Sequence, residues 1–301
     1  MSAPIGNAAD RAAMALAEDG RSMHPSTDDV AVAAYYRWER RNFAHGRHAH
    51  DWLVAEQELT FAADYEVVAR YRLDGVAARQ LGDGDDRRCR FCERTDAQAS
   101  FAGPRFAVPP ALGNQCLLTL EECDDCRAQY DESVGGDLDR FVDSICRDGP
   151  ELSRSFVPVA AFKGLTWAAL ALLPADEMQF LEDTVEWVSN PNHDLDSRSI
   201  DGLECILHRL PDAIAFSWAA IARRADDDAP CPYLLAFFAT GQTVFQIPLP
   251  LCTRDEELEG AWAVPRVASP FGVGRSPLDG HHAVIQLASA QPRRNLRLQY
   301  A

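Results

Sequence analysis

Two Cys-x-x-C pairs constrain this 301-residue chain more than any other feature. The first pair is Cys89 and Cys92, the second is Cys123 and Cys126, and thirty residues separate them. A two-residue gap lets both thiolates of a pair reach one ion at about 2.3 Å, and two such pairs complete a tetrahedral zinc site. The spacing therefore predicts one structural zinc ion held by these four cysteines.

The other five cysteines are scattered singly along the chain, which is typical of buried small side chains. The first twenty residues lack a basic start followed by an apolar core, so we expect no export signal. Together with the cysteine usage, this favours a reducing compartment and a cytoplasmic location. The longest apolar stretch, from Leu165 to Leu173, is far below the roughly 20 residues that span a bilayer. We therefore expect no membrane partner.

The formal net charge is −17, and a charge of this sign opposes non-specific binding to nucleic acid. Basic side chains nevertheless gather around the cysteine pairs: Arg87, Arg88, Arg90, Arg94 and Arg127. They are candidates for nucleic-acid contact. The alternative is structural, because a zinc ion with four thiolates carries a net charge of −2, which arginines can balance by donating to the sulfur atoms.

Hydrophobic periodicity and turn residues predict an α+β protein with distinct segments. Residues 1–26 are expected to be a flexible tail, 27–62 a helical hairpin, and 63–86 a linker. Residues 87–150 form the zinc module, and 151–301 an α+β domain with an antiparallel sheet. The strongest strand signals in that domain are 213–221, 233–239 and 243–249, with 261–265 and 283–287 as further edge strands.

The hairpin segment resembles a small bacterial domain of unknown function over residues 34–59. The matching positions are Ala34, Tyr35, Trp38, Glu39, Gly46, Asp51, Trp52, Ala55, Glu56, Glu58 and Leu59. This resemblance implies an architecture of two helices and no mechanism.

The zinc module resembles the HNH endonucleases that carry a four-cysteine zinc site. The resemblance rests on the two cysteine pairs and on the residues between them, where Pro109 and the run Leu112-Gly113-Asn114 match the family's pattern. It implies a treble clef, in which a zinc knuckle and a β-hairpin precede a helix that carries the last ligands. It also implies a histidine that acts as general base beside a catalytic metal. Phe106 stands at that histidine's position, and Arg127 replaces the asparagine after the second pair.

A phenyl ring can neither accept a proton nor bind a metal. We therefore predict a zinc-binding, catalytically degenerate HNH-like protein without a catalytic divalent metal, which binds nucleic acid or another protein. The alternative is an active metal-dependent endonuclease whose histidine comes from another segment, such as His193 or residues 45–50. A third hypothesis is a zinc switch that releases its metal when the cysteines oxidise.

Two other groups of polar residues could be taken for metal sites. His45, His48 and His50 lie in and after the predicted hairpin turn, and His193 is followed by Asp194 and Asp196 in a second turn. Such runs are usually solvated turns, and we interpret both in that way.

Overall fold

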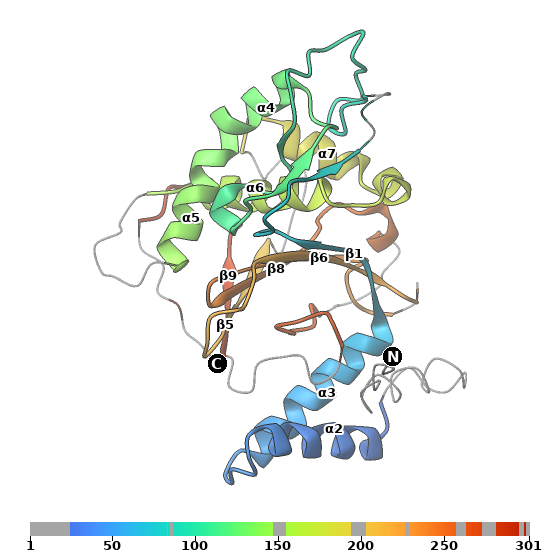
Figure 1. Cartoon of the computed structure of the whole chain (residues 1–301), viewed down its shortest axis with the longest axis vertical. Coiled ribbons are helices and arrows are strands. Elements are labelled where there is room, and N and C mark those ends of the chain that lie inside the picture. Colours follow the sequence, from blue (N-terminus) through green and yellow to red (C-terminus); the bar gives the residue numbers. More distant parts are fainter. Residues whose placement is uncertain are drawn as a thin grey trace.

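The computed structural model describes residues 25–82, 84, 87–146, 155–193, 203–226, 229–256, 263–272, 281–294 and 298. These residues form an α+β fold, which confirms the predicted class. A six-stranded antiparallel sheet lies at the centre. Helices cover one of its faces, and a two-helix hairpin projects beyond the other (Figure 1).

The strand order of the large sheet is β1-β6-β7-β8-β5-β9, and every neighbouring pair is antiparallel. The strands are β1 (Tyr65–Arg72), β5 (Glu204–Arg209), β6 (Trp218–Arg224), β7 (Leu234–Thr240), β8 (Thr243–Pro248) and β9 (His281–Gln286). The predicted hairpin between 233–239 and 243–249 is present as β7 and β8, which a two-residue turn at Gly241 joins. The left-handed φ of Gly241 suits this tight turn.

The helical layer consists of α4 (Asp124–Tyr130), α5 (Gly136–Cys146), α6 (Pro158–Leu170) and α7 (Glu182–Ser189). Helix α6 is buried along its whole length, because its sequence is largely apolar and its two polar side chains, Lys163 and Thr166, donate hydrogen bonds to backbone carbonyls. Two 3-10 turns lie in the connections: η3 (Ala175–Phe180) between α6 and α7, and η4 (Thr253–Asp255) between β8 and β9. A π-helical turn, η2 (Asp131–Gly135), joins α4 to α5 and ends at the Gly135-Gly136 pair.

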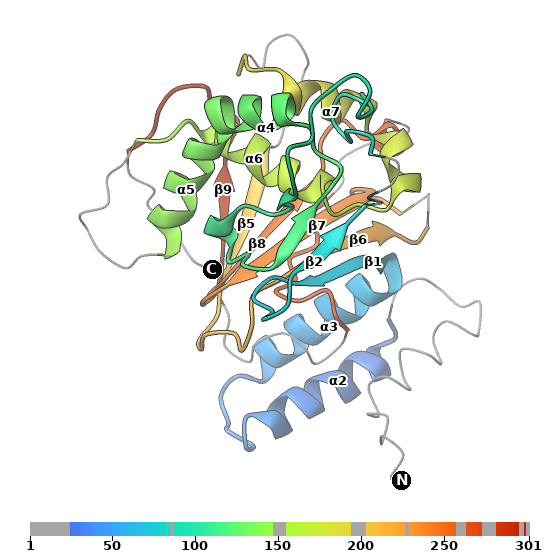
Figure 2. The same cartoon turned by 45° about the horizontal axis from the view of Figure 1, so that its top comes forward.

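A small sheet with the order β2-β4-β3 carries the cysteine-rich segment. It comprises β2 (Arg79–Leu81), β3 (Arg105–Phe106) and β4 (Leu117–Thr119), with the 3-10 turn η1 (Pro110–Leu112) between β3 and β4. Figure 2 shows this segment above the large sheet, beside α4 and α6.

The hairpin consists of α2 (Thr27–Arg40) and α3 (His48–Asp64). A capping box between Ser26 and Asp29 begins α2. Two ion pairs hold the helices together, Arg37 with Glu58 in the interior and Arg41 with Asp51 nearer the turn. The expected tail lies outside the described residues except for Pro25 and Ser26.

Some predicted boundaries were wrong. Residues 63–86 are not a linker, because α3 runs on to Asp64 and β1 then pairs with β6 at the edge of the large sheet. The predicted zinc module and the C-terminal half share one apolar cluster that contains Cys89, Phe141 and Phe238, so they do not pack as independent units. Strand β5 was missed, β6 begins at Trp218 rather than at residue 213, and residues 263–265 form no strand.

Candidate metal centre

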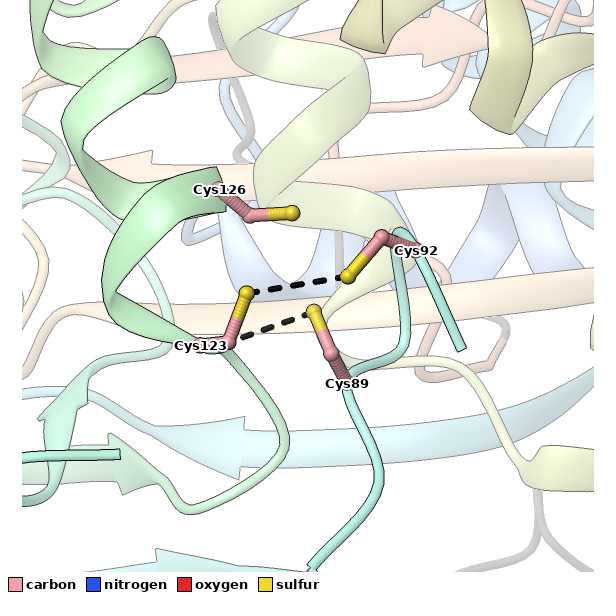
Figure 3. A group of neighbouring side chains, drawn as sticks. All are labelled: Cys89, Cys92, Cys123 and Cys126. Atoms are coloured by element: carbon pink, nitrogen blue, oxygen red, sulfur yellow. Dashed lines mark hydrogen bonds between the residues drawn. The ribbon is translucent and has the colours of Figure 1, made fainter. Parts of the chain in front are cut away.

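The four cysteines predicted to bind zinc lie together in one cluster. One sulfur atom from each of Cys89, Cys92, Cys123 and Cys126 lies within 4.8 Å of all the others (Figure 3). The Cys92 and Cys123 sulfur atoms are 3.6 Å apart. Four sulfur ligands at the corners of a tetrahedron around zinc are separated by about 3.8 Å, so the cluster has the size of a metal site. Cys116 lies outside it, and its sulfur accepts the Gly75 N–H at 3.1 Å.

Two local structures present these sulfur atoms. The first is a tight turn in which the Cys89 carbonyl accepts the Glu93 N–H at 2.8 Å, while the Cys89 N–H donates to the Arg94 carbonyl. The turn requires a left-handed backbone at Glu93, with φ of 58°. The second is the start of α4, where Cys123 is the N-cap residue and Cys126 lies in the first turn. Local backbone geometry therefore places the two sulfur atoms within each pair, and the tertiary fold brings the two pairs together.

The thiols of the cluster perturb one another strongly. Hydrogen bonds from the Cys126 thiol and from neighbouring backbone N–H groups lower the pKa of Cys89 to about 4. The same pairing raises the pKa of Cys126, and burial raises that of Cys123. Neighbouring groups can thus stabilise one thiolate of the cluster. Ionisation of further thiols in this crowded, largely buried group requires a cation that balances the added negative charge.

Of the arginines around the cysteine pairs, Arg94 is the one with hydrogen bonds to the sulfur atoms. Its Nε donates to the Cys92 sulfur at 3.3 Å, and its NH2 group reaches the Cys123 sulfur at 3.8 Å. The same guanidinium pairs with Asp125 on α4 at 2.9 Å. Arg94 therefore connects the two halves of the cluster and brings positive charge to it.

The other four arginines have different surroundings. Arg90 pairs with Glu121 and donates to the carbonyls of Leu170 and Leu173 at the end of α6. Arg87 donates to the Phe101 carbonyl at 3.0 Å, and Arg88 forms a backbone bridge with Thr95. Arg127 lies against the Tyr130 ring and pairs with Asp131 at 3.2 Å.

Phe106 opens onto a groove of about 620 Å³ between the small sheet and α4. Its lining residues are Pro104, Arg105, Phe106, Leu118, Asp124, Arg127, Ala128 and Asp131. Each of the two arginines faces a carboxylate within the groove: Arg105 pairs with Asp124 at 2.7 Å, and Arg127 pairs with Asp131. No histidine lines the groove among the residues that the structure describes.

The histidines proposed as substitutes lie elsewhere. The His193 ring is near Lys163, and burial lowers its pKa. His45 packs against Trp38 in the hairpin, at 5.9 Å between ring centres. Asp194 and Asp196 fall outside the described residues. The only group of three or more metal-ligating side chains found among the described residues is the cysteine cluster.

A second cavity, of about 1070 Å³, lies between the Cys89–Cys92 turn and the segment from η3 to α7. The charged residues that line it are Arg88, Arg90, Glu93, Glu121, Glu182 and Glu186. Acidic side chains outnumber basic ones, and Cys89 and Cys92 contribute to the wall. The surroundings of the cluster are therefore not a basic surface.

Sequence reasoning missed the packing that fixes the cluster to the rest of the protein. The Phe91 ring stacks on Trp167 of α6 with ring centres 3.8 Å apart. The Trp167 indole N–H donates to buried Glu122, and burial raises the pKa of that carboxyl to about 7. An aromatic residue between the two cysteines of one Cys-x-x-C pair is the one sequence signal for this contact, and it does not identify the partner.

The comparisons with known proteins bear on the hairpin alone. A family described as a protein of unknown function (DUF2934) matches residues 25–60, which comprise α2 and most of α3. Searches of curated proteins and of solved structures found no match. Among the described residues, no helix is long and apolar enough to cross a membrane. The chain thus carries a hairpin similar to DUF2934 ahead of a four-cysteine cluster that could bind a metal ion.

Proposed function

We propose that the protein is a non-catalytic zinc protein in which Cys89, Cys92, Cys123 and Cys126 hold one structural zinc ion. The observation that carries this proposal is the convergence of four sulfur atoms within 4.8 Å, from two separate Cys-x-x-C turns. Four soft thiolate ligands in tetrahedral array select zinc or iron, and zinc is the common choice for a closed structural site. The ion would be fully coordinated by protein, with no open position for a reacting water.

The surrounding elements support a treble clef derived from the HNH type. The Cys89–Cys92 turn is followed by β3 and β4 as an antiparallel hairpin, and then by α4 with the last two cysteines at its start. This is the order that the resemblance implies. In this proposal the groove beside Phe106 is the remnant of a nuclease site.

Loss of catalysis follows from the chemistry of that groove. General-base hydrolysis of a phosphodiester needs a group that accepts a proton next to a metal that is open to substrate. Phe106 supplies neither, and it is 36% exposed at the place where the base is expected. The two carboxylates of the groove, Asp124 and Asp131, are engaged by Arg105 and Arg127. The charged side chains of the groove therefore neutralise one another and present no net charge to a ligand.

The same ion pairs favour a protein partner over nucleic acid. Phosphate binding depends on cationic side chains that exchange counterions for the polyanion. Around the cluster, Arg90, Arg94, Arg105 and Arg127 each pair with a carboxylate of the chain, and the net charge is −17. We infer that the zinc module is a scaffold for protein contacts.

Plasmid cleavage tests the absence of catalysis. Purified protein is incubated with supercoiled DNA and magnesium, manganese or nickel, and the expected result is no nicking above a buffer control. Nicking that chelation abolishes and that Arg127→Ala alters would show a working site in the groove and overturn the proposal. A Phe106→His variant that gains cleavage would support the degenerate origin, because it restores the missing base.

Two cysteine variants test the ligand set. Cys92→Ala removes one of the four sulfur atoms, so we expect bound zinc to fall from about one per chain to a small fraction of that. Cys116→Ala is the matched control: it removes a buried thiol that lies outside the cluster, and zinc content should stay unchanged. Equal zinc loss in both variants would contradict the assignment.

A further inference from the structure

The helical hairpin carries an apolar groove that the rest of the described chain leaves open. The groove lies between α2 and α3 near their connecting turn and has a volume of about 670 Å³. Aromatic rings of Tyr35, Trp38 and Trp52 line it, together with alanines and Leu53. Tyr35 is 50% exposed and Leu53 57% exposed, so large apolar side chains of both helices face solvent there.

The hairpin cannot bury this face by itself. Its interior is one small cluster of three buried apolar residues, Val30, Ala55 and Leu59, which is separate from the clusters on the two faces of the large sheet. Two helices alone do not enclose a core, and the stable arrangement for such a pair is to pack against further helices. The exposed apolar face thus needs a partner.

Charge along this face changes from one end to the other. Around the turn, residues 39–51 contain three arginines and three histidines against two acids, Glu39 and Asp51, and Asp51, which lines the groove, pairs with Arg41. On α2, Asp28, Ala31, Tyr35 and Trp38 recur at helical spacing and share one side, with Asp28 at the end far from the turn. On α3, Leu53 and Glu56 extend the same face in the same direction. The hairpin surface that borders the groove therefore has a net positive charge at the turn and acidic side chains at its far end.

We propose that this face binds a second copy of the chain, with the two hairpins packed side by side in antiparallel orientation about a twofold axis. An isologous contact buries the same patch on both copies and closes as a dimer. Antiparallel packing places the basic turn of one copy, with Arg47, beside Asp28 and Glu56 of the other. The distance from Asp28 to Trp38 along α2 is about 15 Å, so both ends of the groove fall within one contact. The result is a four-helix arrangement across the dimer axis.

Nucleic acid is the less favoured occupant. A base needs an open ring face on which to stack, whereas Tyr35 and Phe43 meet Trp38 edge to face at interplanar angles of 68° and 80°. The acidic far end of the groove would also repel a phosphate backbone. This proposal is independent of the zinc site, since none of its residues contacts the cysteine cluster.

The mass of the full-length protein in solution, from analytical ultracentrifugation, tests the proposal. We expect a dimer for the natural chain and a monomer for Leu53→Asp, which places a charge in the apolar face. Val76→Asp is the control, because Val76 is fully exposed and lies between β1 and β2, outside the two helices of the hairpin, and it should stay dimeric. A natural chain that is monomeric at about 100 µM would overturn the proposal, as would equal effects of the two variants.

A charge exchange tests the antiparallel orientation. Asp28→Arg and Arg47→Asp should each raise the dimer dissociation constant about tenfold or more, and the double variant should restore it. Arg47 is the N-cap residue of α3, where aspartate is favourable, so the helix is retained. Failure of the double variant to restore dimerisation contradicts this orientation.

Deletion of residues 1–24 that converts a monomer into a dimer would identify the N-terminal segment as the occupant. A shift of the natural chain with single-stranded oligonucleotide that Leu53→Asp abolishes would identify nucleic acid instead. Either result would overturn the proposal.

Discussion

At the scale of single residues, Arg94 is the side chain that distinguishes the cysteine cluster from four thiols placed by chance. It donates to two of the sulfur atoms from one guanidinium and anchors that guanidinium on Asp125 of α4. Hydrogen bonds to ligand sulfur atoms stabilise their charge and retain the metal. The sequence predicts five arginines near the cysteines, but which of them turns toward the sulfur atoms depends on side-chain direction, which spacing does not specify.

Replacing Arg94 should loosen the metal without removing a ligand. We expect Arg94→Ala to transfer zinc to a chromogenic chelator about tenfold faster than the natural protein. Arg88→Ala is the control, since Arg88 lies next to Cys89 in the same turn and no hydrogen bond joins its guanidinium to the described sulfur atoms. Equal transfer rates for the two variants would show that the Arg94 contact has no influence on the metal.

His208 provides a residue-scale prediction for pH. The Gln246 amide nitrogen donates to the Pro265 carbonyl. The Gln246 amide oxygen therefore accepts from the His208 ring nitrogen Nε2 at 2.9 Å. Burial lowers the pKa of His208 to about 4 from its ordinary value of 6.5. The unfolded chain therefore binds more protons between these values, and the free energy of unfolding should fall as pH decreases from 6.5 to 4. The loss amounts to about 3 kcal/mol.

Denaturant unfolding across this pH range, with His208→Gln beside His281→Gln, measures that contribution. The His208→Gln variant should have a flatter pH dependence, because the titrating group is gone. His281 is exposed on β9, and its replacement should leave the slope of the natural protein. An unchanged slope in His208→Gln would show that other groups govern acid unfolding.

At the scale of elements, the close packing of α6 against α5 depends on a glycine. A Cβ atom added at Gly164 would lie 2.9 Å from the Leu138 Cβ atom, which is closer than such atoms approach. We therefore expect Gly164→Ala to lower the free energy of unfolding by about 1–3 kcal/mol, since overpacking forces helices apart. Gly103→Ala, where nothing lies within 4 Å, should change stability little. Thermal unfolding of both variants compares their stabilities. An unfolding temperature of Gly164→Ala equal to that of the natural protein would show that α5 shifts without loss of stability.

The elements that the sequence predicts well are those whose own residues suffice to define them. The apolar run of α6 and the β7–β8 turn at Gly241 belong to this kind. Strand β1 was missed because its burial comes from pairing with β6, about 150 residues later in the chain, and long-range pairing leaves little mark on a local pattern. The groove beside Phe106 is local by comparison, since all its lining residues fall between Pro104 and Asp131, but it forms only where β3 and α4 pack together.

At the scale of the whole molecule, the cysteine cluster belongs to the same core as the sheet. The apolar cluster on the helical face includes Cys89, Cys123 and Cys126 together with residues of α5, α6, β7 and β8. The stacking of Phe91 on Trp167 connects the first cysteine turn directly to the central helix. Metal ligation should therefore contribute to folding of the entire chain and not of residues 87–150 alone.

Removing the metal tests this coupling. Chelation should lower the unfolding temperature of the whole protein and shift the tryptophan fluorescence, to which buried Trp167 contributes, to longer wavelength, because ligation contributes folding free energy. Restoring zinc should reverse both changes. Loss of the metal with no effect on the main unfolding transition would show that the cysteine segment folds apart from the sheet.

The proposed function depends first on one zinc ion bound by four cysteine sulfur atoms. X-ray absorption at the zinc edge, combined with elemental analysis of freshly purified full-length protein, tests it most directly. The predicted result is one zinc per chain with four sulfur neighbours at about 2.3 Å and no nitrogen or oxygen ligand. Protein that carries no zinc, or zinc with fewer than four sulfur neighbours, would contradict it.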